Sequence, residues 1–133
     1  MNTIQASELR IGNLVWLNDG NFNRYEDFIE AIELGRVSTR NCKTIYFPIE
    51  NIEPIPLTED WLVRFGFREQ LNAHKTHILF LKDIFSLAQK EDFWSAALVT
   101  VTVYPLRVKL KYVHQLQNLY FALTGTELTL TDK

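Results

Sequence analysis

The 133-residue sequence predicts an α+β protein. A small barrel-like β unit (residues 1–57) is followed by a unit of a short helix, an antiparallel meander and a C-terminal helix packed on the sheet (residues 58–133). Apolar residues alternate with polar ones over residues 107–112, which is typical of a half-buried strand. Residues 112–125 have helical apolar spacing and end in glycine. Prolines in residues 48–56 separate the two units; a single compact domain is the alternative.

Composition is that of an ordinary folded chain. Hydrophobic residues make up 47% of it and charged residues 23%, which favours a packed core over disorder. The net charge of −2 lacks the basic excess of a dedicated nucleic-acid binder. The one cysteine, Cys42, excludes an internal disulfide. We expect no signal peptide, no membrane span and a cytoplasmic location, because no apolar window approaches about 20 residues.

The first unit reads as short strands separated by turns. Leu9–Leu17 predicts a strand with a bend at Gly12, and Asn18–Asn21 a turn. Tyr25–Leu34 fits either a helix ending at a glycine or a strand of a hairpin; we favour strands that turn at Leu34–Gly35 into the strand-like run up to Arg40.

The next run, Thr44–Phe47, predicts a further strand, and the prolines up to Pro56 predict an extended edge segment. The bend at Gly12 and these prolines suit a small barrel of the Src-homology-3 type. Such barrels bind through exposed aromatic residues between loops. The candidates here are Trp16, Tyr25 and Tyr46.

The second unit begins with a helix of about two turns, with Thr58 as its N-cap and Gly66 as its stop. Residues 67–111 predict an antiparallel meander. Its expected strands are Thr76–Leu81, which is apolar on both faces, Ile84–Ala88, Phe93–Leu98, Val99–Tyr104 and Arg107–Tyr112. The tail Thr126–Thr131 predicts a short terminal strand.

The last helix buries an apolar face, which we expect to pack on the meander. The buried residues of the helix should be Val113, Leu116, Tyr120 and Leu123. The opposite side of the helix is rich in amides, where a purely solvated face would more often use Lys and Glu. Gln115 and Asn118 are therefore expected either to anchor the helix internally, which we favour, or to contact a partner.

No sequence motif supplies a catalytic, cofactor or metal site. His74 and His77 lack further ligands, and strand spacing would separate their rings. His114 lacks an ionisable local partner, and we expect it to be structural. The carboxylate pairs Glu30–Glu33 and Glu50–Glu53 fit a solvated face. We expect no enzyme activity and no cofactor.

Arg107, Lys109 and Lys111 form the one group with a binding character. Strand spacing predicts a cationic row on one face, near Tyr104. Such a row fits either a phosphate backbone or an acidic protein, and equally a solvated sheet face protected against edge pairing.

Three blocks of the chain resemble a known family. The blocks are Leu9–Val15, Ile52–Leu62 with Phe65–Phe67, and Lys111–Gly125. They resemble small proteins of unknown function encoded by phages, prophages and mobile elements of gut anaerobic bacteria. The resemblance implies a protein that acts in the host cytoplasm; it brings no activity, cofactor or catalytic residue.

Three functions are therefore weighed. We favour a non-enzymatic module that binds a host or phage protein. Nucleic-acid binding through the Arg107–Lys111 row is the second hypothesis. The third is a small enzyme whose site is assembled from distant residues, for example His114 with a carboxylate. A homodimer is compatible with all three.

Overall fold

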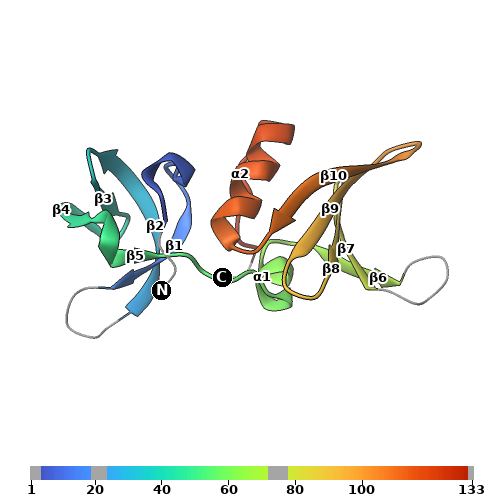
Figure 1. Ribbon diagram of the computed structural model, residues 1–133, viewed down its shortest axis with the longest axis horizontal. Coiled ribbons are helices and arrows are strands. Elements are labelled where there is room, and N and C mark those ends of the chain that lie inside the picture. The colour runs from blue at the N-terminus through green and yellow to red at the C-terminus, as the bar shows by residue number, and fades with distance from the viewer. Residues whose placement is uncertain (1–3, 19–23, 72–77, 132–133) are drawn as a thin grey trace. The chain divides into compact units, whose positions relative to one another are not determined.

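The computed structural model describes residues 4–18, 24–71 and 78–131. Within these residues it contains two five-stranded antiparallel sheets, two α-helices and two short 3-10 helices (Figure 1). The α+β class is therefore confirmed.

The chain divides into two compact units, and each unit is built from two separate segments of the sequence. The first unit consists of residues 1–56 and 112–126, and the second of residues 57–111 and 127–133. The predicted break after residue 57 lies one residue from the first crossing. The sequence placed the last helix in the second unit, whereas its contacts with the first sheet assign it to the first. Apolar spacing defines the buried face of a helix but not the sheet that covers it.

The first sheet has the order β4-β3-β2-β1-β5. Its strands are β1 Leu14–Asn18, β2 Arg24–Glu33, β3 Arg36–Thr39, β4 Cys42–Pro48 and β5 Ile52–Glu53. The 3-10 helices η1 (Ala6–Glu8) and η2 (Ile49–Asn51) precede β1 and β5. In the described residues β4 and β5 remain edges, so the sheet does not close into a barrel.

The strand reading of Tyr25–Leu34 is confirmed. β2 and β3 form a hairpin that turns at Leu34–Gly35, and Gly35 has a φ of +72°, which glycine adopts without strain. A register shift between Ile29 and Ala31 marks a bulge in β2. The first strand is shorter than expected, because the backbone turns at Gly12 before β1 begins at Leu14.

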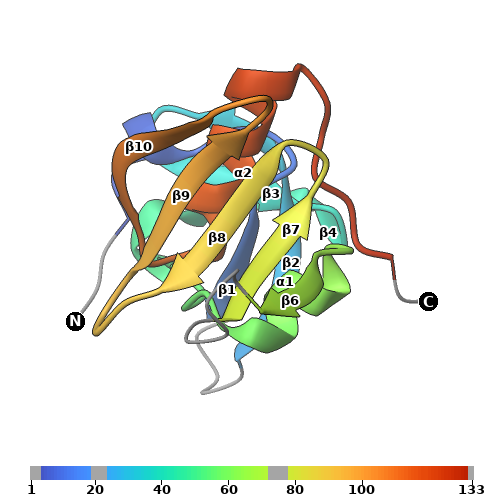
Figure 2. The ribbon, with the colours of Figure 1, turned by 90° about the vertical axis from the view of Figure 1, so that its right-hand side faces the viewer.

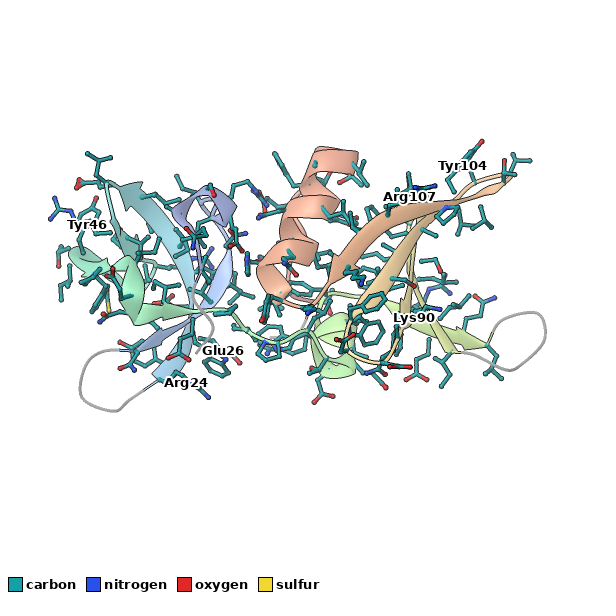
Figure 3. All side chains as sticks on the ribbon, viewed as in Figure 1. Arg24, Glu26, Tyr46, Lys90, Tyr104 and Arg107 are labelled. Atoms are coloured by element: carbon teal, nitrogen blue, oxygen red, sulfur yellow. The ribbon has the colours of Figure 1, made fainter. Side chains whose placement is uncertain are left out.

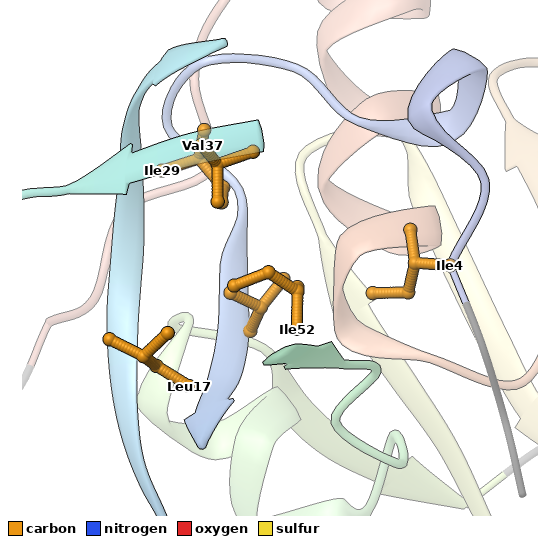
Figure 4. Close-up of a cluster of buried hydrophobic side chains, with 6 residues drawn as sticks. Ile4, Leu17, Ile29, Val37 and Ile52 are labelled. Atoms are coloured by element: carbon orange, nitrogen blue, oxygen red, sulfur yellow. The ribbon is translucent and has the colours of Figure 1, made fainter. Parts of the chain in front are cut away.

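The core of the first unit lies on one face of this sheet (Figure 4). Branched aliphatic side chains fill it, and Leu9, Tyr25 and Phe47 pack around them. The buried members are Ile4, Val15, Leu17, Ile29, Val37 and Ile52.

The second sheet has the order β10-β9-β8-β7-β6 (Figure 2). Its strands are β6 Arg68–Leu71, β7 Ile78–Lys82, β8 Phe85–Gln89, β9 Trp94–Val99 and β10 Val103–Leu110. The meander is confirmed, with β6 as a strand that sequence reasoning missed. Large apolar side chains cover its inward face. They include Phe80, Phe85, Leu87, Trp94 and Leu110, and Phe80 meets Trp94 edge-on at 5.6 Å.

The predicted strand Val99–Tyr104 is wrong. Its middle is the β9–β10 turn, in which Thr100 donates from its backbone N–H to the carbonyl of Thr102 at 2.9 Å. Val101, at the tip, is fully exposed. Pro105 does not interrupt a strand but lies within β10, which tolerates it because β10 is an edge.

Helix α1 spans Glu59–Arg64 after the N-cap Thr58, whose hydroxyl makes no capping bond. The tail is not a strand: the N–H of Thr131 donates to the carbonyl of Arg64 at 2.7 Å. Helix α2 spans Val113–Thr124, and Gly125 caps it at a φ of +74°.

The buried face of α2 differs from the expected one at its end. Leu123 is exposed, while Gln117 takes a buried position between Leu116 and Tyr120. A polar residue thus occupies part of the helix face that packs inside the first unit.

Candidate functional site

The polar side of α2 is anchored inside the first unit. The side chain of Gln117 accepts from the N–H of Leu14 at 2.7 Å and donates to the carbonyl of Gly12 at 3.1 Å. Asn118 accepts from the side-chain amide of Asn13 at 2.8 Å and donates to the carbonyl of Glu8 at 2.8 Å. The preference for internal anchors over partner contacts is therefore supported at Asn118.

Gln115 has a local role. Its side-chain oxygen accepts from the N–H of Tyr112 at 3.1 Å, which closes a capping box at the start of α2. Arg10 extends the anchoring network, because its guanidinium donates to the side chain of Asn118 at 3.2 Å. These polar groups of α2 are used in holding the helix.

His114 is fully buried and lies 2.9 Å from Glu8, measured from Nε2 to Oε1. Its ring stacks on Tyr112 at 6.0 Å. The hydrogen bond to His114 lowers the pKa of Glu8 below its ordinary value of 4.5, against a smaller desolvation effect in the other direction. Because no part of the imidazole reaches solvent, the pair has the geometry of a structural contact.

Trp16 lies on β1 between two carboxylates, with Glu26 opposite it on β2 and Glu53 on β5. The guanidinium of Arg24 lies 4.8 Å from its ring centroid and bonds Glu53 at 3.0 Å. Arg24 and Glu26 both project from β2 (Figure 3). The indole face is therefore covered by an arginine that an ion pair holds in place.

Tyr46 on β4 repeats this arrangement. Arg36 lies 5.0 Å from its ring and bonds Glu33 at 2.7 Å. Every arginine of the first unit in fact stacks on an aromatic ring. The pairs are Arg10 on Phe121, Arg24 on Trp16, Arg36 on Tyr46 and Arg40 on Phe28. A ligand for Trp16 or Tyr46 would have to displace an arginine worth about 0.5–1 kcal/mol at an exposed site.

The cationic row is less regular than strand spacing predicts. Arg107 and Lys109 lie in the part of β10 where pairing with β9 is interrupted, between Leu106 and Leu110. Lys109 stacks on Phe93 at 5.0 Å. Lys111 lies beyond the end of the strand. Tyr104 and Arg107 both stand on β10 (Figure 3).

Sequence reasoning missed the outward face of the second sheet as a surface. Strand pairing aligns the outward residues in two rows that run across the strands. A shorter third row pairs Val99 with Val103. The two longer rows are Arg68–Leu81–Ser86–Ala97–Pro105 and Gln70–Leu79–Ala88–Ser95. The signal was present in β7, which is apolar on both faces.

This face is hollowed. Four small residues on two neighbouring strands form its floor, Ser86 and Ala88 on β8 and Ser95 and Ala97 on β9. Larger side chains form the walls: Leu79 and Leu81 on β7, and the cross-strand pair of Val99, at the end of β9, and Val103, at the start of β10. We call this feature the outer groove; it encloses about 380 Å³. An apolar hollow on an exposed sheet face is a typical feature of binding surfaces.

The described residues contain no group of three or more His, Cys, Asp or Glu side chains able to hold a metal. His74 and His77 lie outside the described residues. Cys42 is a free thiol on β4.

None of the family models, curated proteins and solved structures compared with this chain matches it. The phage and prophage resemblance stays a prediction. Over the residues that the structure describes, neither helix has the length and apolarity needed to cross a bilayer.

Proposed function

We propose that this protein is a non-enzymatic protein-interaction module and that its second unit binds a partner protein through the outer groove. The single observation that carries the proposal is the exposed apolar hollow between β7 and β10. Leu79, Leu81, Val99 and Val103 all remain partly exposed on it. Burial of apolar surface contributes about 25 cal/mol per Å², so covering the exposed parts of these four side chains favours binding.

The first unit serves this function as a scaffold. We propose that it is an open variant of a Src-homology-3-type barrel. Three features support this: the strand order β4-β3-β2-β1-β5, the bulge in β2 and the 3-10 turn before β5. Its candidate binding aromatics, Trp16 and Tyr46, lie under ion-paired arginines, and this favours the second unit as the binding part.

The resemblance to phage and prophage proteins suggests where the partner occurs. We propose a host or phage protein in the cytoplasm of the bacterial host. The exposed cations of β10, Arg107 and Lys109, keep nucleic-acid binding as the second candidate. Their irregular spacing and the stacking of Lys109 on Phe93 make the row a poorer match to a phosphate backbone.

The proposal is tested by affinity capture from the host with three forms of the full chain. The forms are the natural protein, Ala97→Arg in the groove floor and Leu34→Arg in the β2–β3 turn. Leu34 is a matched control, because it is fully exposed and lies in the first unit. We expect a protein that the natural chain and Leu34→Arg retain alike, and that Ala97→Arg retains about tenfold less, a loss of about 1.4 kcal/mol.

Circular dichroism and thermal unfolding must first show that Ala97→Arg is folded, which we expect because the side chain points to solvent. Equal capture by all three forms would disprove binding through the groove. Capture of nucleic acid that falls with salt and with Lys109→Glu would favour the second candidate instead.

A further inference from the structure

We propose that the outer groove receives an amphipathic α-helix of the partner whose apolar stripe is flanked by carboxylates. The inference rests on the proposed function and specifies the chemistry of the partner. Three features support it: the dimensions of the groove, the protection of the β10 edge and the cations beside the groove.

The groove has the dimensions of a helix. Leu79 and Leu81 on β7 lie three strand spacings, or about 14 Å, from the β10 strand that carries Val103, and a helix with its side chains is about 10–12 Å wide. Ser86 stands opposite Ala97, and Ala88 opposite Ser95, so no large side chain rises from the floor. Strands of five or six residues extend about 17–20 Å, which matches about 12 residues of helix.

Addition of a partner strand at the exposed edge of β10 is disfavoured. Pro105 has no N–H to donate, and pairing along β10 is already irregular between Leu106 and Leu110. Arg107 and Lys109 add cations to the same edge. These features keep the β10 edge from pairing, so a partner that approaches on this side of the sheet meets its face instead.

Two cations lie beside the groove lining. Arg68 on β6 stands opposite Leu81, and the exposed Arg107 lies on β10, two residues after Pro105. Among the described residues, none of the outward positions in the paired rows holds a carboxylate. An apolar stripe with acidic residues on both flanks complements this pattern, and such pairs set orientation and association rate more than affinity.

A second copy of the chain complements the surface less well. A two-fold interface brings the same patch together from both partners. Arg68 and Arg107 would then meet a surface with the same cations and no carboxylate in the paired rows. Like charges brought together in this way oppose association, so a different partner chain fits the surface better.

The test uses three synthetic peptides of about 14 residues on the ¹⁵N-labelled full chain. The first has a leucine stripe flanked by glutamates, the second the same stripe flanked by lysines, and the third is a scrambled version of the first. We expect the first to shift the amide signals of residues 79–103 and to bind at least about tenfold more tightly than the second. The scrambled peptide should not bind.

Variants assign the contacts. Ala97→Arg should abolish binding of the glutamate peptide, and Arg68→Glu or Arg107→Glu should each weaken it about three- to tenfold. Lys90→Glu, an equal charge change in the β8–β9 turn of the same unit, should leave it unchanged.

Several results would overturn the inference. They are equal binding of the lysine peptide, no binding of the glutamate peptide up to about 1 mM, or shifts confined to residues outside the groove. Sedimentation that reveals a dimer dissolved by Ala97→Arg would assign the groove to a second copy. The proposed function is judged separately, by capture of a host protein. If Ala97→Arg captures less of that protein than the natural chain, the proposed function stands even when the helix inference fails. If both forms capture it equally, the proposed function itself is disproved.

Discussion

The side-chain oxygen of Gln117 accepts a hydrogen bond from the backbone N–H of Leu14 across 103 residues of sequence, at 2.7 Å. Both residues are buried. The bond joins helix α2 to the start of β1, and the amide nitrogen of the same side chain reaches the carbonyl of Gly12. One glutamine side chain therefore binds two backbone groups at the start of β1.

Replacement of Gln117 by leucine should lower the free energy of unfolding by about 2–4 kcal/mol. Leucine preserves much of the volume but leaves the N–H of Leu14 and the carbonyl of Gly12 without this partner, and each such group costs about 1–3 kcal/mol. Urea unfolding measures the change. Leu123→Ala, at an exposed position of the same helix, is the control and should change stability by less than about 0.5 kcal/mol.

The pair Glu8–His114 predicts a pH dependence. Since the folded pKa of Glu8 lies below its ordinary value, the unfolded chain binds more protons in the acidic range. The contribution of Glu8 to stability is thus present above an ordinary pKa of 4.5 and is lost as the pH falls through the lower folded value.

Thermal unfolding of Glu8→Gln beside the natural chain tests this dependence. The melting temperature of the variant should be lower at neutral pH, and the difference should shrink toward acid. Glu30→Gln, at an exposed position of β2, controls for the loss of one negative charge. A difference that stays constant from neutral to acidic pH would contradict a stabilising role of the Glu8 charge.

Local patterns predicted most of the elements because their causes are local. Gly35 and Gly125 have the positive φ values that a turn and a helix end require, and the sequence placed both correctly. The β9–β10 turn was missed for the opposite reason. It contains neither glycine nor proline, and the bond between Thr100 and Thr102 closes it within an alternating run that resembles a strand.

The candidate site depended on information that spacing does not hold. Periodicity identified a polar side on α2, but the partners of Gln117 and Asn118 lie more than 100 residues away. The outer groove requires the pairing of β7 to β10, and Ser86 and Ala97 become neighbours only through the β8–β9 register. Only the pairing of the strands shows that the small residues gather in one place.

Gly66, after α1, should tolerate substitution less well than Gly35. Both have positive φ, which costs an alanine about 1 kcal/mol. A Cβ at Gly66 would also lie 3.0 Å from the Thr131 side chain and 3.1 Å from that of Lys82, while one at Gly35 meets nothing within 4 Å. We expect Gly66→Ala to cost about 1 kcal/mol more than Gly35→Ala in urea unfolding, since it adds crowding to strain. Equal losses would mean that the neighbouring side chains move aside freely.

The arginines that cover the aromatic rings of the first unit lead to the last prediction. Because an arginine covers one face of Trp16 and of Tyr46, Trp16→Ala and Tyr46→Ala should leave capture of a groove-bound partner within about twofold, whereas Ala97→Arg lowers it about tenfold.

Arg24→Ala is the complementary change. It removes the cover of Trp16 and its ion pair with Glu53, so quenching of tryptophan fluorescence by acrylamide should rise. Stability should fall by no more than about 1–2 kcal/mol, because both contacts are exposed. Partner capture lost in a Trp16→Ala variant that circular dichroism shows to be folded, but retained in Ala97→Arg, would move the binding site to the first unit, since the indole would then contact the partner directly.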